Sequence, residues 1–414
     1  MTCPLPGAAL SRAVALSALL TLPAAAEPAA DATVASDPVF TALKVDGGTV
    51  SGRIRQLGPR GELTLVTDAG PEVVLPLDTL VKLSRDNPGT TPTPEAPAVL
   101  FPGGDRLYRT TIGATNETSL EVHSYLLGKL AIPLDSVLGL VLALATDSDA
   151  LDDLLVRVRN EPRASEVVWL ANGDKLAGSL LGLTDKAVEF QPGAAAIKLD
   201  RAGVVGVGFD PAQVVYLSPR SGLLELTLSD GSRLGVSGAR VEQGHVLAET
   251  RFGAPVKVPL ADLARVYPRT PSVVYLSERA VAGAQYVPYV GPTRPYRRDA
   301  TVEGHPLRLS GQEFERGLGT QSRTLLAYRL EPGDKRFQAR IGLDDRAGPL
   351  GSVVFRVLLD KKEVYLSPPL AARDAPRSID IDVSGSKALF LITEFGERGG
   401  VRDFADWAEA RLIR

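Results

Sequence analysis

A fourfold internal repeat is the feature of this sequence that most restricts its fold. Four segments begin with a glycine-containing motif, at residues 46–50 (DGGTV), 103–107 (GGDRL), 172–176 (NGDKL) and 230–234 (DGSRL). Each segment ends with a short apolar motif, at residues 75–78 (LPLD), 132–135 (IPLD), 197–200 (IKLD) and 258–261 (VPLA). Such self-similarity indicates one supersecondary unit that is used several times.

The repeated motifs predict β-hairpins. Asn-Gly and Asp-Gly pairs tolerate positive φ and are typical of tight hairpin turns. Apolar and polar residues alternate beside the turn at 176–180 (LAGSL), and a second hairpin returns through Gly193. About four or five short strands in roughly 40–45 residues are typical of small barrels. We therefore expect four β units, similar in topology to SH3-like or Sm-like barrels, at residues 38–85, 97–143, 164–210 and 213–268. We expect them to act as scaffold, with the Asp of each turn serving the turn before any ligand.

A single helix is expected between the second and third units, at residues 147–160. Leu151, Leu155 and Val158 have the spacing of one helical face, and Asp147 or Ser148 can cap its start. We expect this helix to separate a first pair of units from a second pair. The stretch 86–97 is rich in proline and threonine, which predicts an exposed connector.

The N-terminus predicts export. Arg12 precedes an apolar run at residues 13–22, and three alanines at 24–26 provide a cleavage site, so residues 1–26 are expected to be a signal peptide. A frayed, alanine-rich tail is the alternative. The single cysteine, Cys3, would leave with the signal, and the mature chain could form no disulfide. No later segment has 18 uninterrupted apolar residues. We expect a periplasmic or extracellular protein that does not span a membrane.

Charge and residue counts argue against several functional classes. The chain of 414 residues has 46 Lys and Arg against 49 Asp and Glu, a net charge of −3, so binding to nucleic acid is disfavoured. Its three histidines lie in separate regions, and no Cys/His metal spacing occurs. The sequence contains no Gly-x-Ser-x-Gly motif, and nothing singles out two carboxylates for glycoside hydrolysis. We therefore expect no enzymatic activity.

The sequence changes character at about residue 272. From there to residue 414 it has 22 basic and 19 acidic residues, so this part is net basic. Alternating segments bounded by Gly, Pro and Asp predict strands at 323–330, 336–343, 352–359, 379–383 and 388–393. Strands of this density predict an antiparallel β-sandwich.

Five blocks of this segment resemble the NPCBM family of carbohydrate-binding modules. They are 317–322 (GLGTQS), 337–345 (FQARIGLDD), 351–357 (GSVVFRV), 379–385 (IDIDVSG) and 403–412 (DFADWAEARL). The resemblance covers residues 272–414 and implies a galactose-binding-like jelly roll that binds carbohydrate. Modules of this family are often attached to glycoside hydrolases and frequently carry a structural calcium ion. The family usually has histidine at two positions that are Gln321 and Phe404 here.

A sugar site needs an aromatic face and a few fixed polar groups. Gln321, Arg323, Glu394, Arg402 and Asp403 are in or beside the matched blocks and are the polar candidates. The aromatic candidates are Tyr286, Tyr289, Phe404 and Trp407. Trp407 could equally be core packing, and the two tyrosines could pack down a connector.

Acidic residues offer a candidate calcium site. Calcium prefers several oxygen ligands, and by analogy with related jelly rolls we expect Asp299 and Glu409 to be its ligands. Glu409 could instead pair only with Arg411 or solvent. Asp344 and Asp345 are expected to form a turn, with a cation site as the alternative.

These observations lead to three functional hypotheses. The first is an exported, non-catalytic protein whose C-terminal jelly roll binds a glycan or polysaccharide. The second is a structural protein of the cell envelope that contacts other proteins, which the residues Gln321 and Phe404 favour. The third is an accessory subunit of a polysaccharide-degrading system.

Overall fold

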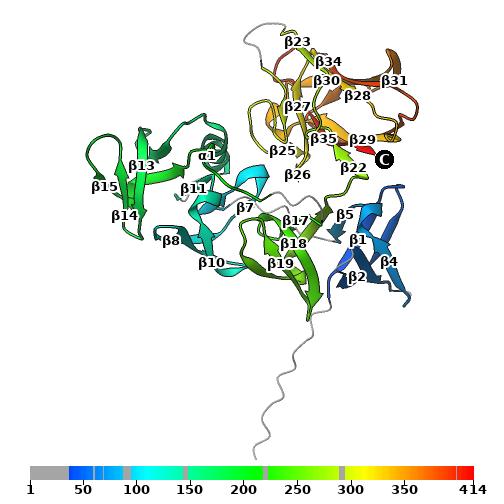
Figure 1. Cartoon of the computed structure of the whole chain (residues 1–414). Helices are drawn as coiled ribbons and strands as arrows, with labels where there is room; N and C mark the ends of the chain where they lie inside the picture. The colour runs from blue at the N-terminus through cyan, green and yellow to red at the C-terminus, as the bar shows by residue number, and fades with distance from the viewer. Residues whose placement is uncertain are drawn as a thin grey trace, which may run out of the picture. The chain divides into compact units, whose positions relative to one another are not determined.

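The computed structural model describes residues 37–58, 61–68, 70–86, 95–142, 148–217, 222–288, 294–397 and 399–414. The expected signal peptide, Asp147 and most of the expected connector lie outside these residues. The fold is almost entirely β-sheet (Figure 1). No helix in the described ranges is both long and apolar enough to cross a membrane.

The first unit is a five-stranded antiparallel sheet. Its first strand pairs with both the second and the fifth strand, so the strand order in space is fifth, first, second, third and fourth. A single turn of 3-10 helix precedes the fifth strand. The elements are β1 (Val39–Lys44), β2 (Thr49–Leu57), β3 (Glu62–Val66), β4 (Glu72–Pro76), η1 (Leu77–Thr79) and β5 (Leu80–Arg85).

The third and fourth units repeat this order, and all four units have a 3-10 turn before the last strand. The second unit differs, because it has six strands and three of them form a separate sheet in the order β10-β9-β8. The second has β6 (Ala98–Leu100), η2 (Pro102–Gly104), β7 (Arg106–Leu107), β8 (Thr110–Thr115), β9 (Ser119–Ser124), β10 (Gly128–Pro133), η3 (Leu134–Ser136) and β11 (Gly139–Val141). The third has β12 (Glu166–Leu170), β13 (Lys175–Leu183), β14 (Ala187–Gln191), β15 (Ile197–Asp200), η4 (Arg201–Gly203) and β16 (Val204–Gly208). The fourth has β17 (Leu224–Leu228), β18 (Arg233–Glu242), β19 (His245–Thr250), β20 (Pro255–Pro259), η5 (Leu260–Asp262) and β21 (Leu263–Pro268).

The glycine turns have the conformation that their sequence predicts. Gly47, Gly173 and Gly231 have φ of +86°, +91° and +83°. In the turn before β18, the side chain of Asp230 accepts a hydrogen bond from the backbone N–H of Ser232 at 2.8 Å. Asp230 therefore serves its turn, as expected. The expectation is wrong for Asp105, whose Oδ2 accepts hydrogen bonds from the Tyr216 hydroxyl at 2.7 Å and the Gly235 N–H at 2.8 Å.

The units pair through their last strands, in an order that the sequence did not predict. β5 of the first unit pairs with β21 of the fourth, with Leu83 opposite Val266. β11 of the second unit pairs with β16 of the third, with Leu140 opposite Val207. The expectation that the helix separates units one and two from units three and four is therefore wrong. Through their last strands, unit one pairs with unit four and unit two pairs with unit three. One further pair, Arg106 opposite Arg233, links the second unit to the fourth.

Helix α1 (Ser148–Asn160) covers the joint between the second and third units. Its apolar face, with Leu151, Leu155 and Val158, packs in one buried cluster with Trp169 and Val141. Because those last two residues come from different units, the helix holds the two units together rather than spacing them apart. Its proposed capping side chains lie outside the described part of the chain.

Residues from about 272 onward form the predicted sandwich of two antiparallel sheets. One sheet has the order β24 (Arg297–Arg298), β27 (Gly317–Gln321), β35 (Phe404–Ile413), β29 (Arg336–Leu343), β33 (Arg377–Asp382), with β22 (Val273–Tyr275) also paired to β35. The other has the order β23 (Gly283–Tyr286), β28 (Thr324–Arg329), β34 (Ala388–Phe395), β30 (Ser352–Leu359), β31 (Lys362–Leu366), with β32 (Leu370–Ala371) paired to β30. A separate hairpin is made by β25 (Leu307–Leu309) and β26 (Gln312–Phe314). All five strands predicted in this region are present.

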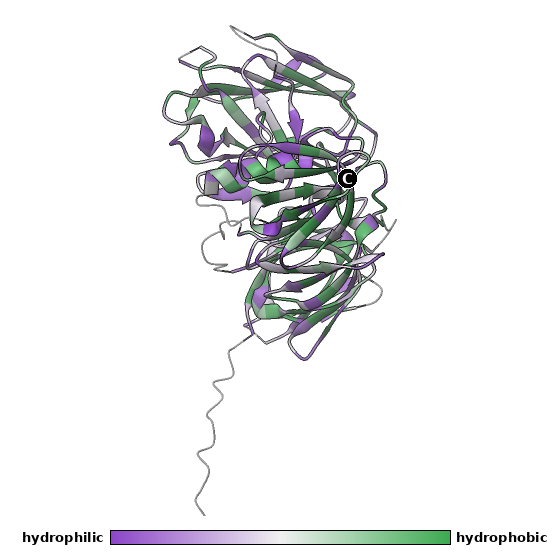
Figure 2. Cartoon of the chain, turned by 90° about the vertical axis from the view of Figure 1, so that its left-hand side faces the viewer, coloured by the Kyte–Doolittle hydropathy of each residue, from purple (hydrophilic) through white to green (hydrophobic). Residues whose placement is uncertain are grey.

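The sandwich has its own hydrophobic core. Apolar residues (green) and hydrophilic residues (purple) alternate along many of its strands in Figure 2. The buried side chains include Phe337, Phe355 and Trp407, and the rings of Phe355 and Trp407 meet edge to face with centroids 5.0 Å apart. Such a pair contributes about 0.5–1.5 kcal/mol beyond the burial of its area.

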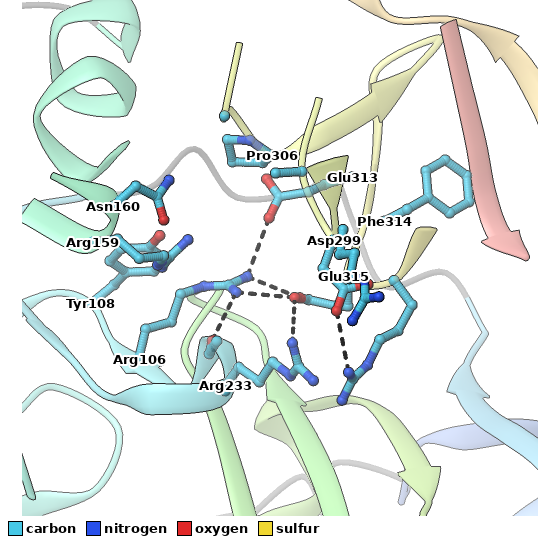
Figure 3. Close-up of a pocket in the computed structure, with 16 residues that line it drawn as sticks. Arg106, Tyr108, Arg159, Asn160, Arg233, Asp299, Pro306, Glu313, Phe314 and Glu315 are labelled. Carbon is cyan, nitrogen blue, oxygen red and sulfur yellow. Dashed lines mark hydrogen bonds and ion pairs between the residues drawn. The ribbon is translucent and has the colours of Figure 1, made fainter. Parts of the chain in front are cut away.

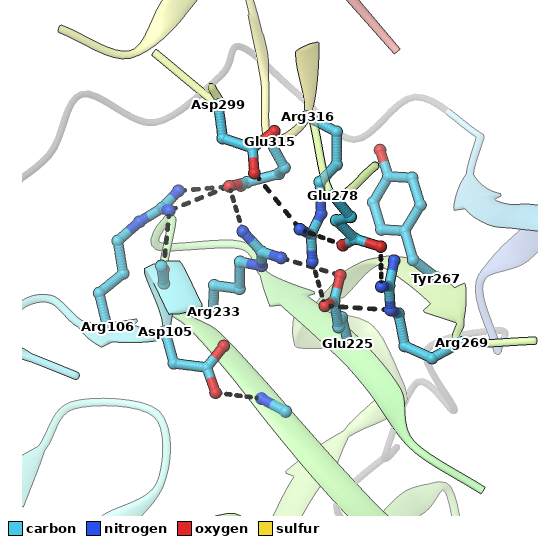
Figure 4. Close-up of polar contacts among 12 residues, drawn as sticks. Asp105, Arg106, Glu225, Arg233, Tyr267, Arg269, Glu278, Asp299, Glu315 and Arg316 are labelled. Atoms are coloured by element: carbon cyan, nitrogen blue, oxygen red, sulfur yellow. Dashed lines mark hydrogen bonds and ion pairs between the residues drawn. The ribbon is translucent and has the colours of Figure 1, made fainter. Parts of the chain in front are cut away.

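The sandwich contacts the β units through buried ion pairs, and residues 37–414 form one compact unit. Arg233 of the fourth unit pairs with Glu225 at 2.8 Å and with Glu315, just after β26, at 3.2 Å (Figure 4). Arg106 of the second unit pairs with Glu315 at 2.9 Å. Because these side chains are almost fully buried, losing one partner would leave an uncompensated charge, which is strongly unfavourable.

Candidate functional site

Most of the predicted sugar-contact residues come together at one end of the sandwich, which we call the sugar rim (Tyr286, Gln321, Arg323, Glu394, Phe395 and residues 402–404). Strand pairing brings them there. At the ends of β27 and β35, Gln321 lies opposite Phe404. In the other sheet Thr324 lies opposite both Tyr286 and Thr393, which places Arg323 and Glu394 beside them.

Gln321 and Tyr286 form the polar and aromatic pair of the sugar rim. The hydroxyl of Tyr286 donates a hydrogen bond to Oε1 of Gln321 at 3.2 Å. Both side chains are half-buried, so part of each remains available to a ligand. Burial raises the pKa of Tyr286, so its hydroxyl stays protonated. The pair could offer a ring face together with the Gln321 amide.

Arg323 and Glu394 are the more accessible charged groups of the sugar rim. Arg323 is exposed, has a left-handed φ of +65°, and holds its guanidinium 5.8 Å from the ring centroid of Phe395. Glu394 has 34% of its side chain exposed, and its nearest cation is Nη1 of Arg356 at 3.8 Å. Arg356 is held more closely by Glu363, at 2.7 Å. Glu394 is therefore only loosely engaged.

Phe404 is covered by two arginines. It is 6% exposed, and the guanidinium carbons of Arg294 and Arg402 lie 5.7 and 5.6 Å from its ring centroid. Arg402 also donates to two backbone carbonyls, from Nε to Ala347 at 2.8 Å and from Nη2 to Arg346 at 2.5 Å. Arg402 thus fixes the loop 344–348 to the start of β35. A sugar could reach the Phe404 ring only if these guanidinium groups moved.

Asp403 is buried and positions a strand. Its Oδ1 accepts the backbone N–H of Ser352 at 3.0 Å, which joins the start of β35 to the start of β30. Burial raises the pKa of Asp403, and hydrogen bonds from Ser352 and Ser322 oppose that rise. The carboxyl group therefore acts within the fold, and Asp403 is not a surface ligand for sugar.

Trp407 is not at the sugar rim, so its assignment as a sugar-contact residue is wrong. It is completely buried, and its Nε1 donates to Oγ1 of Thr393 at 3.2 Å. It lies three residues inward from Phe404 on β35 and opposite Ile341 on β29, with its ring in the core. The alternative interpretation of Trp407, as core packing, is the one that the structure supports. Tyr289 lies outside the described residues.

The structure does not combine Asp299 and Glu409 into one metal site. Asp299 pairs with Arg316 at 3.4 Å and accepts the backbone N–H of Gly317 at 3.0 Å. Glu409 pairs with Lys82 at 2.7 Å. Each carboxylate has an internal cation as its partner, and the described residues contain no cluster of three or more His, Cys, Asp or Glu suited to a metal ion. Calcium binding by this chain stays a prediction, without these two residues as its shared ligands.

Asp344 and Asp345 form a turn, which was the favoured expectation. Oδ1 of Asp344 accepts the backbone N–H of Arg346 at 2.9 Å. Asp345 accepts the N–H groups of Ser310 and Gly311 at 2.7 and 2.8 Å. The two acids therefore attach the β25–β26 hairpin to the sandwich.

Residues 272–413 match the NPCBM/NEW2 domain family. The matched segment corresponds to the sandwich and includes all residues of the sugar rim. The match covers about a third of the chain, and the four β units lie outside it.

Comparison with individual proteins gives more limited similarities. A protein of Renibacterium salmoninarum, provisionally named endo-alpha-N-acetylgalactosaminidase, is 30% identical over 114 residues, which are 28% of this chain and 8% of that protein. The match therefore spans far less than two thirds of that relative.

Solved structures show similarity at low TM-scores. The CBM51 module of Clostridium perfringens GH95, in complex with methyl-galactose, is 23% identical with a TM-score of 0.32, over 34% of this chain and 99% of that one. The CBM51-2 and INT domains of Clostridium perfringens ZmpB, in complex with GlcNAc, are 21% identical with a TM-score of 0.32, over 43% of this chain and 40% of that one.

Sequence reasoning missed two groups of residues. Phe395 belongs to the sugar rim and Arg294 covers its Phe404 ring, and the position of Phe395 directly after Glu394 was the available signal. The buried residues Arg106, Arg233, Glu225 and Glu315 were also missed. They come from distant parts of the chain, so no local spacing could have revealed their contact.

Proposed function

We propose that this chain is an exported, non-catalytic glycan-binding protein that holds its ligand at the sugar rim. The observation that carries the proposal is the match of residues 272–413 to the NPCBM/NEW2 domain. The accessible polar groups of that domain's rim, Arg323 and Glu394, lie beside the half-buried pair of Tyr286 and Gln321. A ring with convergent donors and acceptors is what recognition of a sugar requires.

In this proposal the charged groups of the sugar rim contact hydroxyls. Glu394 accepts hydrogen bonds, Arg323 donates them, and Gln321 can do both. The Tyr286 ring supplies the apolar face. The four β units serve as a scaffold that presents the sandwich, and the compartment is periplasmic or extracellular.

A glycan array with the full chain tests the proposal. We expect saturable retention of at least one glycan, reduced tenfold or more in Arg323→Ala and in Glu394→Gln. Arg329→Ala is the matched control, because Arg329 is an exposed arginine on the same strand as Thr324, five positions from it. Repeating the array with a chelator tests the calcium prediction separately.

Two results would count against this function. The first is absence of retention on any glycan by the folded wild-type chain. The second is retention that the sugar-rim variants leave at the wild-type level.

A second candidate function is protein contact within the cell envelope. The observation that favours it is the cover of Arg294 and Arg402 over Phe404, which removes one ring from the sugar rim. Two results together would support this candidate instead. The folded wild-type protein would bind no glycan but would pull down an envelope protein, and Arg323→Ala would no longer pull that protein down. The role of accessory subunit for a polysaccharide-degrading system would need, in addition, binding to the polysaccharide that the system cleaves.

A further inference from the structure

A cavity lies away from the sugar rim, where the second β unit, the end of α1 and the C-terminal domain meet. Its volume is about 250 Å³. Figure 3 shows Tyr108, Arg159 and Asn160 on one side, with Glu313 and Pro306 facing them. Because Asn160 is exposed, the cavity reaches the surface at that edge.

The wall of this cavity has an excess of positive charge. It contains the arginines Arg106, Arg159, Arg233, Arg298 and Arg316 and the acids Asp299, Glu313 and Glu315. All three acids already have partners within the chain. Glu313 and Glu315 pair with Arg106 at 3.2 and 2.9 Å, and Asp299 pairs with Arg316 at 3.4 Å.

Arg159 and Arg298 are left over from this pairing. Neither side chain has an ion pair or hydrogen bond within the described residues. Nε of Arg159 is buried without a hydrogen-bond partner. Burial lowers the pKa of Arg159, and repulsion from Arg106 adds to that decrease. A guanidinium remains charged in spite of such a shift. The wall therefore holds a cation that has no ion pair with any described residue and feels only longer-range attraction from Glu315 and Glu313.

Such a cation is costly unless an anion accompanies it. A planar guanidinium matches the two oxygens of a carboxylate and can bind them with two parallel hydrogen bonds. Next to Arg159, the Tyr108 hydroxyl and the Asn160 amide can donate further hydrogen bonds. Tyr108 is almost fully buried, and burial raises its pKa, so its hydroxyl keeps its proton.

The size of the cavity restricts the ligand. Pockets for drug-sized molecules have volumes of roughly 300–1,000 Å³, and this one, at about 250 Å³, is slightly smaller. An oligosaccharide would not fit inside it. A single small molecule or one sugar ring is the appropriate size.

We propose that this cavity binds an oxyanion on a molecule no larger than a monosaccharide, with the carboxylate of an acidic sugar as the ligand that best matches Arg159, Tyr108 and Asn160. The site does not involve the sugar rim, so it is independent of the proposed function. It requires the second β unit, α1 and the C-terminal domain together, so only the full chain would contain it.

Isothermal titration calorimetry of the full chain tests this proposal, with glucuronate, neutral glucose and inorganic sulfate as probes. We expect saturable binding of glucuronate that weakens as salt is added, and no binding of glucose. Arg159→Gln and Tyr108→Phe remove one contact each. We expect binding to weaken tenfold or more in the first variant and several-fold in the second. Arg157→Gln is the matched control, because Arg157 is exposed on the same helix.

The outcomes separate the possible sources of the anion. Sulfate that binds as tightly as glucuronate would support an oxyanion site and overturn its assignment to an acidic sugar. Failure of both anions to bind the folded wild type would overturn the site altogether. Unchanged glucuronate binding in Arg159→Gln would also overturn the site. If that variant does not fold, unchanged binding in Tyr108→Phe would overturn it in the same way. Loss of glycan retention at the sugar rim would leave all these results unaffected.

Discussion

Nζ of Lys82 lies 2.7 Å from Oε1 of Glu409, which joins the last strand of the first β unit to the last strand of the sandwich. Both side chains are largely buried, with exposed fractions of 17% and 6%. Arg411 is a second cation at 3.4 Å from Glu409, and the hydroxyl of Tyr267 donates to the same carboxylate at 3.3 Å. A residue predicted to bind calcium thus connects two parts of the chain that are more than 300 positions apart.

Removing the cation of this pair should destabilise the protein. Breaking a buried ion pair by removal of one partner costs about 3–5 kcal/mol, and Arg411 should keep the loss in Lys82→Met near the lower end, about 3 kcal/mol. Urea unfolding of the full chain measures it. Lys257→Met, at an exposed position of β20, serves as control and should change the stability by less than about 0.5 kcal/mol. The double variant with Glu409→Leu should recover only part of the loss, because it removes the unpaired carboxylate but leaves the buried Arg411 without its ion pair.

The same carboxylate predicts an acid-sensitive stability. Burial alone would raise the pKa of Glu409, but attraction to Lys82 and Arg411 outweighs it and lowers the pKa from 4.5 to about 2. The stabilisation is therefore fully present above about pH 4.5 and is lost as the pH falls toward 2. The stabilisation that follows from the lowered pKa of Glu409 corresponds to about 3 kcal/mol. The difference in unfolding free energy between wild type and Lys82→Met should narrow as the pH falls from 4.5 to 3, and part of it should remain at pH 3. A constant difference would exclude this contribution.

Asp406 should show the opposite pH dependence. It is completely buried between Gly319 and Gly342 on the neighbouring strands, and burial together with the nearby Asp344 raises its pKa well above 3.8. A raised carboxyl pKa makes the folded state lose stability as the pH rises from 3.8 through the folded-state pKa. Asp406→Asn removes this loss. The melting temperature of the variant minus that of the wild type should therefore be larger at pH 8 than at pH 4. An equal shift at both pH values would contradict the raised pKa.

Trp407→Ala tests the corrected role of that residue. Truncation of a buried aromatic side chain costs about 3–5 kcal/mol, so we expect that loss in unfolding free energy. Glycan retention per folded molecule should stay within twofold of wild type, because the ring does not reach the sugar rim. Tenfold weaker retention in a variant that remains folded would restore Trp407 to the site.

Features that depend on neighbouring residues could be predicted from the sequence. The Asn-Gly and Asp-Gly turns, the five strands from 323 to 393 and the helix at 147–160 all follow from backbone preferences and periodicity within short windows. The sequence also predicted that Gln321, Arg323 and Glu394 lie at one end of the sandwich, because the loops of a sandwich lie at the ends of its strands. Local signals predict the direction of a side chain less well. Asp403 and Trp407 share a motif with Phe404, yet only tertiary packing decides that the Trp407 ring lies in the core.

The sequence by itself determined that this chain forms four similar β units followed by a β-sandwich, because turn chemistry and the alternation of apolar residues act locally. Only the tertiary structure decided that unit one pairs with unit four and unit two with unit three, since similar edge strands offer the same backbone groups to every partner. It also decided that Glu409 meets Lys82, and that Arg159 lines the cavity beside α1 without an ion pair to any residue that the structure describes. Charged side chains from distant segments can pair, or remain unpaired, only after folding has buried them in the same place.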